Sequence, residues 1–216
     1  GFLPTNSLNK IIVTNFQKII LIITLIISML NIYLLFNFFN KKILTKEHKE
    51  DFYIIGVAVI FILLIYLNHY QGLEIIISIL SSLSNSGLTL IQSDNNLSLY
   101  FLFITIIGGS LISNTSGVKL IRLYILLKIT SAEIFKLISP NSVINKTIYN
   151  SERKITDENV KISFLIFISF FLSLFILSSC LVVDNIGFER SFKLSILTLT
   201  NTVNSELFNL ENLNFS

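Results

Sequence analysis

Four consecutive residues at positions 84–87, Ser-Asn-Ser-Gly, could coordinate a cation through their backbone. They follow an apolar segment, 75–83, that is too short to cross a bilayer, which needs roughly 20 apolar residues. The C-terminus of such a half-length helix carries roughly −0.5 elementary charge, and rings of carbonyls in a polar strand can replace the hydration shell of potassium. Glycine lets the strand adopt a positive φ or lie close to a neighbour. We therefore predict a cation filter, with an ordinary outer turn as the alternative. The residues assigned to it are Asn85, Ser86, Gly87 and Leu88.

The same pattern recurs 116 positions later, counted from Leu83 to Leu199. The segment 195–203 reads SILTLTNTV, and 78–87 reads SILSSLSNSG, so each is a short apolar stretch followed by asparagine and small hydroxyl residues. The first residues of the chain, Gly-Phe-Leu, also resemble Gly-Leu-Thr at 87–89. Internal repeats are common in transport folds. The further filter residues predicted in this way are Gly1, Phe2, Asn201, Thr202 and Val203.

Val203 stands where the other copy has Gly87. Valine is β-branched, and a positive φ is a genuine outlier for it. One interpretation is that this strand stays extended in a less symmetric filter. The other is a slip by one position, which gives the glycine role to Asn204, a residue type that tolerates left-handed geometry better. The match of Thr-Asn-Thr at 200–202 favours the first.

A stretch rich in glycine and hydroxyl residues, 108–117, interrupts the charge-free span 97–118. Glycine lowers helix propensity by about 1 kcal/mol relative to alanine, and serine, asparagine and threonine compete for backbone hydrogen bonds. In lipid, a broken helix is tolerated only inside protein or beside a water-filled cavity. We predict a membrane helix that breaks beside a hydrated pathway, the alternative being a short helix and a polar loop outside the membrane. The residues assigned to the break and to the basic groups after it are Gly108, Gly109, Ser113, Asn114, Thr115, Ser116, Gly117, Lys119 and Arg122.

The composition is that of an integral membrane protein rather than a soluble enzyme. Hydrophobic residues make up 52% and charged residues 13% of the chain, and the mean hydropathy is +0.75. His48 and His69 have no metal-ligand partner at a useful spacing, and Cys180 has no second cysteine for an internal disulfide. The sequence contains no recognisable nucleophile–base arrangement and no phosphate-binding glycine loop, so we do not predict an enzyme.

Apolar stretches of two lengths predict the elements that position these residues. The membrane spans are 19–39, 52–67, 97–118 and 162–183, and the half-length segments are 75–83 and 192–199. Segment 40–51 carries four lysines, and 119–161 carries eight lysines or arginines. By the positive-inside rule both face the cytoplasm. The half-length segments then enter and leave the membrane from the outer side.

The sequence resembles the membrane subunits of Trk/Ktr/HKT-type potassium transporters, above all the TrkH-like branch. The resemblance is carried by IGGSLISNTSGVKLIRLYILLK at 107–128, LISPNSV at 137–143 and LSNSGLT at 83–89, and it covers nearly the whole chain. It implies an all-α integral membrane protein in which repeated helix–re-entrant pore helix–helix units surround one pore. It also implies potassium uptake across the cytoplasmic (inner) membrane, with the residues of the break acting as an intramembrane gating loop.

The resemblance implies that the chain is a piece of a longer protein that has a further repeat before it and a last helix after it. The expected units are the second filter strand with its following helix (1–39), the third pore repeat (40–130), a cytoplasmic connector (131–160) and an incomplete fourth repeat (161–216). The implied partners are a second copy of the protein and a cytosolic nucleotide-binding regulatory subunit, with no nucleic acid. Potassium would be the transported ion, held by filter carbonyls only, and no cofactor is expected.

A membrane-embedded scaffold is the alternative function. Its polar helix breaks would serve helix packing through small residues. A scaffold needs no regular recurrence of half-length apolar segments followed by polar turns, whereas a pore does.

Overall fold

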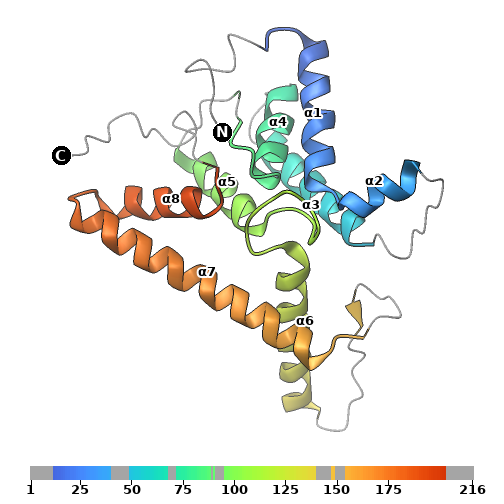
Figure 1. Cartoon of the computed structure of the whole chain (residues 1–216), viewed down its shortest axis with the longest axis vertical. Coiled ribbons are helices and arrows are strands. Elements are labelled where there is room, and N and C mark those ends of the chain that lie inside the picture. Colours follow the sequence, from blue (N-terminus) through green and yellow to red (C-terminus); the bar gives the residue numbers. More distant parts are fainter. Residues whose placement is uncertain are drawn as a thin grey trace.

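Helices dominate the part of the chain that a computed structural model describes, which is residues 12–39, 49–67, 72–88, 90, 95–139, 147–148 and 154–202. The helices in these residues are α1 (Asn15–Met29), α2 (Ile32–Phe39), α3 (Lys49–Tyr66), α4 (Gly72–Leu83), α5 (Asn95–Ile107), α6 (Leu120–Ile138), α7 (Asp157–Val183) and α8 (Phe188–Leu199) (Figure 1). Within these ranges, the only β contact is an isolated bridge between Thr147 and Lys154. The predicted all-α class is confirmed for the described residues.

Two of the helices begin where the sequence supplies a cap. At the start of α1, the Thr14 hydroxyl accepts the N–H of Gln17 (3.3 Å), and the Gln17 side chain accepts the N–H of Thr14 (3.1 Å). This reciprocal pair is a capping box, which satisfies two otherwise orphaned backbone donors. At the start of α7, the Thr156 hydroxyl accepts the N–H of Asn159 (3.2 Å). Each threonine therefore fixes the residue at which its helix starts.

The apolar run 19–39, predicted as a single membrane helix, forms two helices instead. α1 ends at Met29 and α2 begins at Ile32, although the sequence has neither proline nor glycine there. The backbone freed by the break has a partner far along the chain, because the N–H of Asn31 donates to the carboxylate of Asp51 (2.9 Å). The prediction was wrong because tertiary contacts, rather than local helix propensity, decide where this helix stops.

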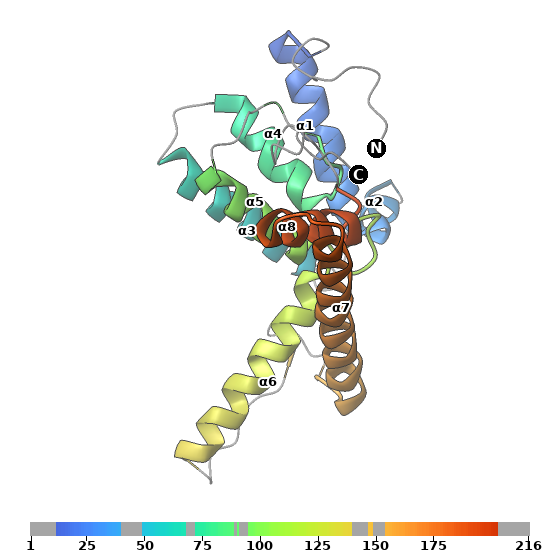
Figure 2. The same cartoon turned by 90° about the vertical axis from the view of Figure 1, so that its left-hand side faces the viewer.

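α4 lies at the centre of the body formed by α1, α3, α4 and α5 (Figures 1 and 2). It packs against α1, α3 and α5, and its residues 77–83 are all buried. The buried serines do not need outside partners, since Ser78 donates to the carbonyl of Glu74 (3.0 Å) and Ser82 to that of Ser78 (2.9 Å). Small side chains of this kind let helices approach closely in a membrane protein.

α6 and α7 extend away from this body, and α8 folds back along α7 (Figures 1 and 2). α7 has 27 residues, and its most apolar 18-residue stretch has a mean hydropathy of 2.6. It is the one helix in the described residues that is long and apolar enough to cross a membrane. At 1.5 Å per residue it is about 40 Å long, more than the roughly 30 Å hydrocarbon core. The helix predicted at 162–183 is therefore present.

Much of the α7 surface is apolar and exposed. Phe164, Leu165 and Phe175 each expose more than half of their surface, at 55%, 65% and 57%. Soluble monomers rarely leave such contiguous apolar surface open to water. This surface therefore faces lipid or further protein, as a membrane protein requires.

Candidate functional site

The chain turns sharply after α4, at the residues predicted to line a filter. The N–H of Asn85 donates to the carbonyl of Ser82 (3.3 Å), and that of Ser86 to the carbonyl of Ser81 (3.0 Å). Asn85 has a φ of +54°, and Gly87, two residues on, has a φ of +70°. This is a Schellman ending with asparagine in the left-handed position, which satisfies carbonyls at the end of the helix.

α8 ends in a turn of the same geometry. The N–H of Asn201 donates to the carbonyl of Thr198 (3.1 Å), and that of Thr202 to the carbonyl of Leu197 (2.8 Å). The φ of Asn201 is +54°, equal to that of Asn85. Each donor and each acceptor lies 116 positions after its counterpart in the α4 turn. As far as Thr202, the two turns share one backbone register, the one in which their sequences align without a slip.

The two turns lie against each other. A Cβ atom placed on Gly87 would be 3.3 Å from both the carbonyl carbon and the carbonyl oxygen of Thr202. Any side chain at position 87 would therefore press on the backbone of the other turn, in addition to the strain of a positive φ. The ends of α4 and α8 thus converge on one place, with a glycine at the contact.

Hydrogen bonds of hydroxyl groups stabilise both turns internally. The Ser81 and Ser86 hydroxyls are 2.8 Å apart, and the Ser81 oxygen also accepts the N–H of Leu88 (2.7 Å). In the second turn, the hydroxyls of Thr200 and Thr202 are 2.7 Å apart. These bonds fix the direction in which the chain leaves each helix.

Between α5 and α6 the chain leaves the helical path for residues 108–119, a range that contains the break predicted at 108–117. Gly108 and Gly117 have positive φ values of +67° and +90°. The N–H of Val118 donates to the carbonyl of Ile106 (2.9 Å), so the chain returns to the point at which it left α5. A Cβ on Gly117 would lie only 2.8 Å from that same carbonyl oxygen, which leaves room for glycine alone.

Lys119 holds this loop together from within. Its side chain is buried, with 7% of the residue exposed. The ammonium group donates to the carbonyl oxygen of Thr115, to the Thr115 hydroxyl (2.8 Å) and to the Ser113 hydroxyl (3.3 Å). It also attracts the carboxylate of Glu50 electrostatically. Charge-assisted hydrogen bonds of this kind are roughly twice as strong as neutral ones.

Two residues predicted with the loop take no part in the hydrogen bonds that Lys119 makes inside it. Asn114 is exposed. Arg122 belongs to α6 and lines an open cleft of 610 Å³ together with Ile125 and Lys154. The sequence grouped them with the loop by position, but the structure does not place their side chains with the loop's internal bonds.

The loop is bonded to the α8 turn, and the helix that leads into the loop, α5, is bonded to the α4 turn. The Ser116 hydroxyl donates to the carbonyl of Thr200 at the end of α8. The side-chain amide of Asn85 donates to the carbonyl of Thr105 in the last turns of α5 (3.0 Å), next to the start of the loop. The loop therefore lies directly beside the place where the two turns converge.

Sequence reasoning missed the residues that hold the loop from the other side. The N–H of Leu111 donates to the Glu50 carboxylate (2.8 Å), and the N–H of Ser110 donates to the carbonyl of Met29 (3.0 Å). In the sequence, Glu50 is one of several charges in a short loop before an apolar helix, where acidic residues are common because they complement the helix dipole. No pattern in the sequence marked it, or Met29, as a partner of the loop.

Three predicted filter residues lie outside the described residues. They are Gly1, Phe2 and Val203.

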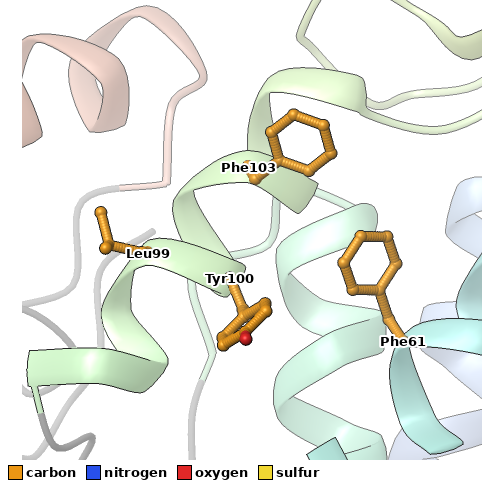
Figure 3. Close-up of a pocket in the computed structure, with 4 residues that line it drawn as sticks. All are labelled: Phe61, Leu99, Tyr100 and Phe103. Carbon is orange, nitrogen blue, oxygen red and sulfur yellow. The ribbon is translucent and has the colours of Figure 1, made fainter. Parts of the chain in front are cut away.

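An apolar groove of 730 Å³ lies away from these turns, between α3 and α5. Figure 3 shows its lining, with Phe61 on α3 and with Leu99, Tyr100 and Phe103 on α5. The Phe61 and Phe103 ring centroids are 6.3 Å apart. Because this lining is mostly hydrocarbon, it is suited to lipid or to a further helix rather than to an ion.

Known proteins resemble this chain in sequence over about half of its length and in fold over nearly all of it. No protein-family model matches the sequence. An uncharacterized cation transporter of Methanocaldococcus jannaschii is 30% identical over 112 residues, which are 49% of this chain and 24% of that protein.

The potassium transporter TrkH of Vibrio parahaemolyticus has a similar structure. The superposition has a TM-score of 0.82 at 21% sequence identity and covers 94% of this chain and 46% of that one. The chain therefore spans less than half of either protein. The resemblance stated from the motifs is confirmed at the level of the fold, which is similar to that of TrkH.

Proposed function

We propose that this chain forms part of a potassium-conducting pore in the cytoplasmic membrane. The observation that carries the proposal is the pair of helix-end turns, equal in backbone register, that meet where Gly87 faces Thr202. The similarity to a named potassium transporter and to a cation transporter supports the same ion class.

The chemistry follows from the ends of the helices. α4 and α8 both direct their C-termini toward the meeting point, and each C-terminus carries roughly −0.5 elementary charge. Backbone carbonyls beyond the two turns replace part of the water around the ion. In this proposal, two of the strands around the pore come from this chain as 85–88 and 201–203, and others from 1–2 and from the rest of the protein.

The loop 108–119 serves as the gate in this proposal. It lies behind both turns, is bonded to Thr200 through Ser116, and is stabilised internally by Lys119. In that position, the loop obstructs the path of an ion that moves from the turns toward the cytoplasm. We further propose, from the resemblance, a homodimer and a cytosolic nucleotide-binding subunit that controls this loop.

Replacing Gly87 by serine tests the filter. In the full-length protein, expressed in a strain deficient in potassium uptake, Gly87→Ser should lower the preference for potassium over sodium. The added Cβ presses on the Thr202 backbone and a positive φ is strained, so the spacing of the carbonyls changes. Uptake of both ions, measured side by side, reports the preference.

Gly187→Ser is the matched control, because a Cβ there meets nothing within 4 Å. It adds the same atoms at the start of α8 and should leave the preference unchanged. Equal, unaltered selectivity in both variants would favour the scaffold function over the pore.

Shortening the loop tests the gate. Removal of residues 111–115 from the full-length protein should raise potassium flux and weaken control by the regulatory subunit, since the obstruction is smaller. Flux is measured as tracer uptake into vesicles, with size-exclusion chromatography to check assembly. An unchanged flux in a protein that still assembles would rule out a gate at this loop.

A further inference from the structure

The break between α1 and α2 is the place where the loop docks. A helix that stops leaves backbone groups without partners inside the helix. Here the loop supplies two of those partners, since the carbonyl of Met29 accepts the N–H of Ser110 (3.0 Å) and the N–H of Ile32 donates to the carbonyl of Ile112 (3.0 Å). A Cβ on Gly109 would lie 2.7 Å from the Met29 carbonyl oxygen, so the fit is close enough to require glycine.

Two neighbouring carboxylates in the first turn of α3 hold the two sides of this contact. Glu50 accepts the N–H of Leu111 in the loop (2.8 Å). Asp51, which is 1% exposed, accepts the N–H of Asn31 in the break (2.9 Å). In each bond the acceptor is a carboxyl oxygen, and a carboxylate accepts a stronger hydrogen bond than a neutral group does.

The two acids differ in their surroundings. Asp51 is buried and holds the break between α1 and α2 from inside the body. Glu50 is only partly buried, and Leu111, its partner, exposes 40% of its surface. The bond of Glu50 can therefore open without disrupting the core, whereas the bond of Asp51 cannot.

From this geometry we infer that Glu50 is a positioning residue that latches the loop onto the α1–α2 break, with Asp51 as the fixed anchor of that break. This inference rests on the proposed function, in which the loop gates the pore. Release of the latch frees the loop from Met29 and Ile32 and lets it move from behind the helix-end turns. Lys119 acts on the loop's own fold, and Glu50 acts on its position.

The test uses the full-length protein with Ser110 replaced by cysteine. Ser110 is fully buried, so a thiol there reacts slowly while the loop is docked. The exposed Cys180 is replaced by serine to remove background reaction. The measurements are the rate of Cys modification by a small water-soluble maleimide, the potassium flux without activating ligand, and the ratio of potassium to sodium uptake.

Glu50→Ala removes the acceptor for Leu111. We expect the modification rate and the basal flux each to rise about tenfold, the size expected for loss of a hydrogen bond to a charged group. The potassium-to-sodium ratio should stay the same, because the helix-end turns are not altered. Glu50→Gln keeps an acceptor oxygen without the charge and should give a smaller rise in both, which separates the latch from a general loss of folding.

Glu133→Ala is the control, because Glu133 is an exposed acid paired with Lys136 far along α6. It should change none of the three measurements. If Glu50→Ala leaves both rates at the parent level while removal of residues 111–115 still raises flux, the latch is wrong and the gate stands. If thiol reactivity rises with no change in flux, the latch holds the loop but the loop is not a gate, and the proposed function fails.

Discussion

At the scale of single residues, Lys119 is held in a conformation that lysine avoids. Its φ is +73° and its ψ is 133°, and a sparsely populated backbone conformation of this kind costs of order 1–3 kcal/mol. Such strain persists only where the surroundings determine it. Here the surroundings are the oxygens of Thr115 and Ser113, which receive the ammonium group. The side chain, rather than the backbone, therefore accounts for a lysine at this position.

Two substitutions separate the effect of the backbone strain at Lys119 on stability from the effect of its ammonium hydrogen bonds. Lys119→Met keeps the strain and removes the ammonium group, so the free energy of unfolding should fall by about 1.5–3 kcal/mol, the range for hydrogen bonds to a charged group. Lys119→Gly removes both and should be less destabilising than Lys119→Met. The thermal unfolding midpoints of the two variants in detergent show which one is less stable.

The control for this pair is Lys136→Met, at an exposed lysine on α6, the helix that begins directly after Lys119. Its effect should stay within about 0.5 kcal/mol. If Lys119→Met were no more destabilising than this control, the ammonium contacts would contribute nothing and the strain would need another cause.

At the scale of elements, the sequence predicted breaks that glycine causes and missed the one that contacts cause. The break at 108–117 is visible because glycine and hydroxyl residues weaken a helix locally. The break after Met29 is not visible, because Leu30 and Asn31 stand in an apolar run with no helix breaker. Its cause is the carboxylate of Asp51 and the backbone of the loop, which the sequence does not place beside it.

The two helix-end turns were the most predictable element of the site. Asparagine and small hydroxyl residues favour a left-handed C-terminal turn, and both sequences carry them at the same spacing. Their convergence, with Gly87 against Thr202, could not be predicted, since it depends on how α4 and α8 pack through α5 and α7. The same holds for Glu50, whose role depends on a partner 61 positions away.

At the scale of the whole molecule, the loop 108–119 contacts elements from several parts of the chain. It contacts the α1–α2 break, the start of α3, the neighbourhood of the α4 turn and the end of α8. Movement of the loop therefore changes contacts with each of these elements. In the proposed function, these contacts couple an ion site at the turns to the gate. This chain matches just under half of the solved transporter, 46%, so the proposed ring of strands includes others that it does not supply.

The symmetry of that proposed ring yields the last prediction. The α4 and α8 turns coincide in register up to Ser86 and Thr202, and the next residues in sequence are Gly87 and Val203. Val203 lies outside the described residues, but valine as a residue type cannot adopt a φ of +70° without strain. We therefore predict that this strand binds the ion less tightly than the one at Gly87. In the full-length protein, Val203→Gly should tighten potassium selectivity or lower the apparent KM for potassium.

Gly87→Val makes the opposite exchange and should abolish transport, because it combines the strained φ with pressure on the Thr202 backbone. Rubidium tracer uptake over a range of concentrations, with sodium as competitor, gives both the apparent KM and the selectivity for each variant. The two substitutions should move these quantities in opposite directions. If both substitutions impaired potassium uptake equally, valine and glycine would perform the same role at these two positions. The alignment of Val203 with Gly87 would then be wrong. The alternative alignment, which puts Asn204 in the glycine position, would replace it.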